Sequence, residues 1–113
     1  MNENIDKETE QQIKELQILE QNMQNILMQK QAFQAELSEV ENAFEELNKA
    51  GDDVYRIVGN IMMKSSKADI LKDIKQKKDL ISIRLKTIEN QEKSIEEAAE
   101  SLRKKVLSKI KKE

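Results

Sequence analysis

The sequence predicts a mainly α-helical chain, a long antiparallel two-helix coiled coil whose helices are joined by a single β-hairpin. Two long stretches repeat apolar residues with alternating steps of three and four, as coiled coils do. Between them, residues 54–64 place two β-rich runs around a Gly-Asn pair, a spacing typical of a two-residue hairpin turn. The chain has no proline and two glycines in 113 residues, so little interrupts either helix. We expect one domain over 1–113, with a helix at about 5–50, the hairpin at about 53–65 and a helix at about 66–112.

The first helix is predicted by a regular apolar repeat, whose positions we call the seam. Nine of its twelve seam positions are apolar, which is sustained enough to indicate a coiled coil. They are Thr9, Gln12, Leu16, Leu19, Met23, Ile26, Lys30, Phe33, Leu37, Val40, Phe44 and Leu47. Gly51 follows at the place where a C′ glycine ends a helix.

The predicted hairpin is apolar on both faces. With Gly59 and Asn60 as the turn, Val58 faces Ile61 on one side, and Ile57 lies on the other. A lone two-stranded hairpin is marginally stable in water, and apolar faces with free edges require further strands. The chain offers no other strand, so we expect the partners to come from other subunits. The expected interface residues are Val54, Tyr55, Ile57, Val58, Ile61, Met62 and Met63.

The second helix is predicted to begin after Ser66, an N-cap candidate with Asp69 three residues on. Its seam again has nine apolar residues in twelve positions. They are Leu71, Ile74, Lys78, Ile81, Leu85, Ile88, Glu92, Ile95, Ala99, Leu102, Val106 and Lys109.

Charged residues that interrupt the apolar pattern of the two seams predict how the helices align. If facing residues have numbers that sum to about 121 or 122, the out-of-pattern Lys30 and Glu92 fall opposite one another. The same alignment brings the large Met23 beside the small Ala99, as interdigitation prefers.

Composition excludes most chemistry. Apolar and charged residues each make up 37%, which suits a narrow buried stripe better than a globular core. The chain has neither cysteine nor histidine, so disulfides, thiol chemistry, the usual zinc ligands and Ser-His or Cys-His pairs are excluded. The abundant Asp and Glu fall at helix-surface positions, where they read as solvated charges. We therefore expect no catalytic residue, no cofactor and no metal.

Composition also bears on location. No apolar stretch approaches the roughly 20 residues that span a membrane, and no secretory apolar region follows Met1. These features lead us to expect a cytoplasmic protein that binds no membrane. The net charge of −2 argues against general nucleic-acid binding.

The residues of the hairpin carry a resemblance to a known family. The run Val-Tyr-Arg-Ile-Val-Gly-Asn-Ile-Met-Met-Lys at 54–64 is preceded by Leu47 to Asp53. A helix containing Arg-Leu-Lys-Thr-Ile-Glu at 84–89 follows it. Together they resemble the β class of prefoldin subunits, and its archaeal members most. The resemblance covers essentially the whole chain, and the single hairpin separates it from the α class, which carries two.

The resemblance implies an assembly and an activity. It implies a hexamer of two α-class and four β-class subunits, in which the hairpins form a β-barrel platform and the coiled coils project as arms. It implies that the hexamer captures unfolded proteins at the arm tips without ATP and passes them to a group II chaperonin.

Apolar residues near the chain ends are the candidate client site. Some lie off the seam, and others belong to its last turns, which fray in a two-helix arm. The candidates are Ile13, Leu16, Ile18, Leu102, Val106, Leu107 and Ile110. The alternative is that these residues only close the coiled coil.

The two chain ends carry opposite charge. Residues 1–20 hold six acidic and two basic side chains, whereas 103–113 hold six basic and one acidic. Mutual pairing is one explanation. The other is that the tail steers the arm toward an acidic chaperonin face. Nucleic-acid binding is weaker, since no aromatic residue interleaves with the lysines. The docking candidates are Lys104, Lys105, Lys109, Lys111 and Lys112.

Two classes of function remain open on the residues alone. The first is an ATP-independent holdase chaperone subunit. The second is a structural coiled-coil spacer or scaffold without client binding, in which the hairpin sets only the oligomeric state. Suppression of the aggregation of a denatured enzyme separates the two.

Overall fold

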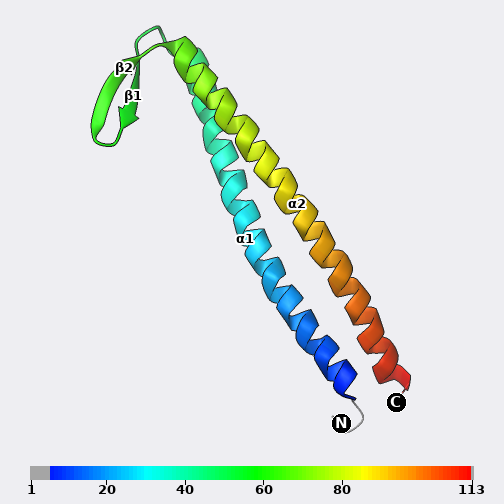
Figure 1. Ribbon diagram of the computed structural model, residues 1–113. Helices are drawn as coiled ribbons and strands as arrows, with labels where there is room; N and C mark the ends of the chain where they lie inside the picture. Colours follow the sequence, from blue (N-terminus) through cyan, green and yellow to red (C-terminus); the bar gives the residue numbers. More distant parts are fainter. Residues whose placement is uncertain (1–5, 113) are drawn as a thin grey trace. The chain divides into compact units, whose positions relative to one another are not determined.

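A computed structural model describes residues 6–112, except for the side chain of Lys112. Its elements, in chain order, are α1 (Lys7–Lys49), β1 (Val54–Val58), β2 (Ile61–Ser65) and α2 (Lys67–Lys112) (Figure 1). The predicted fold class, two long helices around one antiparallel hairpin, is confirmed. The expected helix start near residue 5 lies outside the described residues.

The chain divides into two compact units. Unit 1 joins the described residues up to Lys30 to those from Thr87 onward, so it contains the beginning of α1 and the end of α2. Unit 2 spans 31–86 and contains the hairpin with the helical segments on either side of it. In each unit the two helical segments run side by side in opposite directions (Figure 1).

The two ends of α1 are stabilised by contacts that the sequence pattern did not indicate. Asp6 is the N-cap, since its Oδ1 accepts a hydrogen bond of 2.7 Å from the amide of Thr9. At the other end, Lys67 Nζ donates to the carbonyl oxygen of Ala50 at 3.1 Å. The expectation that Gly51 acts as a C′ glycine was wrong. α1 ends at Lys49, and Gly51 lacks the left-handed φ that such a cap requires. The hydrogen bond from Lys67 satisfies a carbonyl at this end of the helix instead.

The hairpin has the predicted register. Val58 pairs with Ile61, Ile57 with Met62, and the ladder continues to the pair at 54 and 65. Gly59 has a φ of 62°, and no other described residue has a positive φ, so the φ of Asn60 is negative. A positive φ at the first turn residue alone is the pattern of a type II′ turn, which matches the right-handed twist of the strands.

The start of α2 is also as predicted. Ser66 precedes the helix, and its Oγ accepts a hydrogen bond of 3.1 Å from the amide of Asp69. The carboxylate of Asp69 lies in the first turn, where it complements the helix dipole.

The seam forms the core. All but one of the buried apolar residues among those described belong to it, and Val54 is the exception. They are Ile26, Val40, Leu47, Ile81, Ile88, Ala99 and Val106. In unit 1, Lys30 Nζ lies 3.0 Å from Glu92 Oε1, which confirms the predicted alignment. Both side chains are about three-quarters buried, so the pair replaces an apolar layer of the seam. No described helix is apolar over enough of its length to span a membrane.

Candidate functional surfaces

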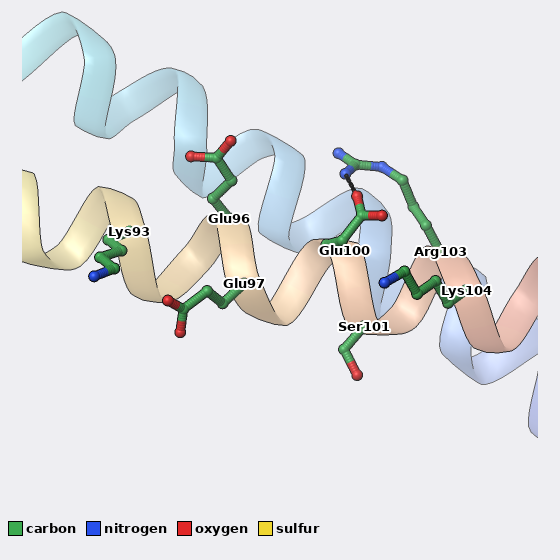
Figure 2. A pocket seen from close by; sticks show the side chains of 7 residues that line it. All are labelled: Lys93, Glu96, Glu97, Glu100, Ser101, Arg103 and Lys104. Carbon is green, nitrogen blue, oxygen red and sulfur yellow. Dashed lines mark hydrogen bonds and ion pairs between the residues drawn. The ribbon is translucent and has the colours of Figure 1, made fainter.

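The acidic side chains of the described residues do not gather into a metal site. No group of three or more Asp, Glu, Cys or His residues among them could hold a metal ion. Figure 2 shows a shallow hollow whose lining side chains all project from α2 and point in different directions. Its one drawn contact is the ion pair between Arg103 and Glu100 at 3.3 Å, three residues apart on the same helix. This hollow is a solvated helix face of mixed charge.

The hairpin exposes most of its apolar side chains. Ile57, at 70% exposure, is the most open of them, and Val58 and Ile61 beside the turn are 54% and 64% exposed. Tyr55, Met62 and Met63 are exposed as well. Val54 differs from the other expected interface residues because it is already buried within the chain. We call the six exposed residues the hairpin surface.

Both faces of the ribbon contribute to this surface. Val58 and Ile61 are paired on one face, and Ile57 and Met62 are paired on the other. The sheet has two strands, so the outer edge of each is free of a strand partner within the described chain. Both faces of the ribbon therefore expose apolar side chains, and no strand of the described chain covers either outer edge. Ribbons with exposed apolar faces and open edges are found where other strands complete the sheet.

Contacts at its base hold the hairpin in place within unit 2. Val54 is buried, and Arg56 on β1 forms an ion pair with Asp73 on α2. Lys64 on β2 lies 3.9 Å from Asp53, just before β1. The apolar surface is therefore presented by a ribbon that is anchored at its open end.

The candidate client residues lie in unit 1, on the start of α1 and the end of α2. We call this set of residues the tip surface. Ile18, Leu107 and Ile110 are about half exposed. Ile13, Leu16 and Leu102 are half-buried, and Val106 is buried. Sequence reasoning thus grouped three kinds of residue: exposed candidates, half-buried candidates, and one core residue.

Polar contacts close this end of unit 1. Lys109 Nζ lies 2.8 Å from Asp6 Oδ2 and 3.8 Å from Glu8 Oε2. The hydrogen bonds that Asp6 accepts from Lys109, and then from Thr9, hold the pKa of the Asp6 carboxyl well below its usual range. The Thr9 side chain beneath them is 1% exposed. Sequence reasoning missed Asp6 as the N-cap, although Asp just before the start of a helical pattern is among the favoured N-cap residues.

The candidate docking lysines do not share one environment. Lys104, Lys105 and Lys111 are exposed and form no ion pair with the described residues. Lys109 is engaged with Asp6 and Glu8, as the pairing explanation of the charge asymmetry predicts. The side chain of Lys112 lies outside the described part of the chain.

A groove along the seam of unit 1 was also missed. Met23 on α1 and Ala99 on α2 line it together, as their predicted proximity requires, with Leu19 and Ile95 beside them. Its volume is about 420 Å³, and charged side chains of both signs, among them Glu92 and Arg103, also line it.

The comparisons agree with this geometry. The family model described as "Prefoldin subunit" matches residues 10–113. The chain belongs to the prefoldin subunit family. The prefoldin subunit beta of Methanospirillum hungatei is 36% identical over 110 residues, which cover 96% of this chain and 92% of that protein. The prefoldin subunit beta of Archaeoglobus fulgidus is 39% identical over 87 residues, 75% of each chain.

A solved structure has the same fold. The crystal structure of the prefoldin beta subunit from Thermococcus strain KS-1 matches with a TM-score of 0.88 and 30% sequence identity, covering 92% of this chain and 93% of that one. The resemblance to β-class prefoldin is thereby confirmed. Membership of this family implies a non-enzymatic chaperone subunit that assembles with other prefoldin subunits.

Proposed function

We propose that this prefoldin subunit works as one of four β-class subunits which, with two α-class subunits, form an ATP-independent holdase. The holdase captures unfolded proteins at its tip surfaces and transfers them to a group II chaperonin in the cytoplasm. The observation that carries the proposal is that two exposed apolar surfaces lie in different units of one chain, the hairpin surface in unit 2 and the tip surface in unit 1.

The hairpin surface is suited to assembly. Its residues are opposed in pairs on both faces of an anchored ribbon, so further strands can add at its edges and bury both faces. Ordered strand addition favours a fixed partner, because backbone hydrogen bonds set the register.

The tip surface is suited to client capture. Ile18, Leu107 and Ile110 project from helices, which offer no free backbone edge, so a partner is held through side chains alone. Such contacts demand no particular partner sequence and suit unfolded chains, whose exposed apolar segments vary.

A matched pair of variants tests capture. Leu107→Ser with Ile110→Ser removes two half-exposed apolar side chains from the tip surface on α2. Leu80→Ser with Ile83→Ser removes the same two residue types from comparable exposure on α2 in unit 2. With an α-class subunit present, we expect the first variant to lose suppression of the aggregation of a denatured enzyme, and the second to retain it. Equal protection by both variants would rule out capture at the tip surface.

The lysines at the end of α2 are the proposed contacts with the chaperonin. Lys104, Lys105 and Lys111 are exposed on α2, and Lys112 follows on the same helix. Changing these four to Gln should leave aggregation suppression intact and weaken transfer to chaperonin, and wild-type docking should weaken as salt rises. Normal docking of the Gln variant at low salt would contradict this role.

The alternative is a structural spacer whose hairpin only sets the oligomeric state. A holdase suppresses the aggregation of a denatured enzyme when the two are mixed at roughly stoichiometric ratio. A spacer assembled with its α-class partner would not suppress it at that ratio.

A further inference from the structure

The seam loses its apolar character at the end of unit 1. Its first two positions are Thr9 and Gln12, before the apolar positions begin at Leu16. Thr9 is nonetheless 1% exposed, so this polar position of the seam is buried. Gln12 Oε1 is also buried and accepts no hydrogen bond from the described residues. A buried carbonyl oxygen without a donor disfavours the closed arrangement, since water would satisfy it if the helices parted.

One ionic contact opposes that tendency. Asp6 uses Oδ1 to cap α1 through the Thr9 amide at 2.7 Å and Oδ2 to receive Lys109 Nζ of α2 at 2.8 Å. A single carboxylate therefore starts one helix and ties it to the end of the other. Glu8 adds a second, longer contact to Lys109 at 3.8 Å.

The contacts that hold the two helix ends together are weak. The side chains of Asp6 and Lys109 are about half exposed, so their attraction is modest and screened by salt. No apolar layer of the seam lies outside Thr9 and Gln12 in the described chain to hold the helices together. Just inside them, Val106 is buried, while Leu16 and Leu102 are half-buried.

We propose that the Asp6–Lys109 contact is a clasp that controls access to the tip surface. When it releases, the ends of α1 and α2 part, Gln12 gains water, and Val106 joins Leu107 and Ile110 as surface that an apolar segment of an unfolded chain can cover. The proposal rests on the proposed function, whose capture site it regulates.

Opening can be measured without any client. The chain has no cysteine, so two can be introduced for spin labels at Gln11 on α1 and Ser108 on α2, both of which are exposed. Asp6→Asn removes the charge and keeps the cap, because Asn caps helices as well as Asp. Lys109→Gln removes the other charge. Each should raise the population at long label separations about two- to fivefold, the range expected for one exposed ion pair.

Matched controls separate the clasp from general charge effects. Glu10→Gln and Lys14→Gln change the same charges on exposed side chains of α1 that form no ion pair with the described residues. Their label separations should match those of the unmodified chain. Raising salt should open the parent chain and leave Asp6→Asn unaffected, since the screened contact is already absent.

A variant with the opposite effect completes the test. Gln12→Leu removes the unsatisfied oxygen and adds an apolar layer to the seam, so it should reduce the open population. Assembled with an α-class subunit, it should also suppress aggregation less well, whereas Asp6→Asn should suppress it at lower chaperone concentration.

The readouts distinguish the possible failures. If Asp6→Asn and Lys109→Gln leave the label separations unchanged, the clasp is overturned whatever the clients do. If they open the helices without changing capture, regulation of the site is overturned. Capture at the tip surface is tested by a separate measurement, the protection of clients by the Leu107→Ser, Ile110→Ser variant.

Discussion

Replacing Val58 and Ile61 together by Asp should release the subunit from its assembly without unfolding its helices. The two residues are opposed across the turn end of the ribbon, at 54% and 64% exposure. Because they contribute little to the fold of the single chain, their surface is available for burial by neighbouring strands.

The magnitude follows from that exposure. Complete burial of a Val or Ile side chain contributes about 1.5–3 kcal/mol, and over half of each is still open, so assembly gains about 1 kcal/mol or more from each. Asp in their place leaves two carboxylates without partners, at a further cost of about 1–3 kcal/mol each. The sum is about 4 kcal/mol or more for each hairpin, a weakening of about a thousandfold.

Native mass spectrometry of the variant mixed with an α-class subunit measures this loss directly, and circular dichroism checks that the helices remain. The control carries Asn60→Asp and Lys75→Gln, which change the net charge by the same amount at exposed polar positions of unit 2. We expect the control to assemble. If the Val58, Ile61 variant assembles at micromolar concentration as the control does, the hairpin surface is not the assembly surface.

Other expected outcomes rest on single contacts. Lys30→Met should lower the free energy of unfolding in urea by about 1–3 kcal/mol, because it leaves Glu92 partly buried without its cation. Met at both positions should restore the stability. An equal loss of stability in the single and double variants would contradict this reasoning. Gly59→Ala should speed amide exchange across the hairpin, because a φ of 62° costs about 1–2 kcal/mol for an L-residue although no atom lies within 4 Å of the added carbon; Asn there should exchange more slowly than Ala. Hydrogen bonds from Lys109 lower the pKa of Asp6 in the folded state, so that stabilisation is complete above the ordinary value of 3.8 and is lost as the pH falls through the folded pKa. Asp6→Asn should remove this part of the acid unfolding profile, and an unchanged profile would refute it.

Local patterns in the sequence were enough for the elements and their alignment. The step of three and four identifies the buried stripe of each helix, because side-chain direction in a helix depends only on spacing. The hairpin register follows from its two-residue turn in the same way. The alignment of α1 with α2 needed one more signal, the charged residues Lys30 and Glu92 at seam positions. A charged side chain within a buried seam is costly unless it is paired, so the two were expected to lie opposite one another.

Side-chain partners at the helix ends could not be obtained by the same reasoning. Gly51 has the residue type of a cap, yet Lys67 supplies the contact, because a terminal carbonyl accepts whichever donor the fold brings near. The same holds for Asp6 and Lys109, which are over a hundred residues apart in sequence.

Exposure was the other property that required the tertiary structure. The apolar residues 54 and 58 lie on the same face of β1, and only the first is buried. Periodicity assigns a residue to a face, but whether that face is covered depends on what packs against it. The sequence by itself therefore determined the elements, their register and the family resemblance. The tertiary structure decided which apolar residues remain open to a partner and which charges meet to close the end of unit 1.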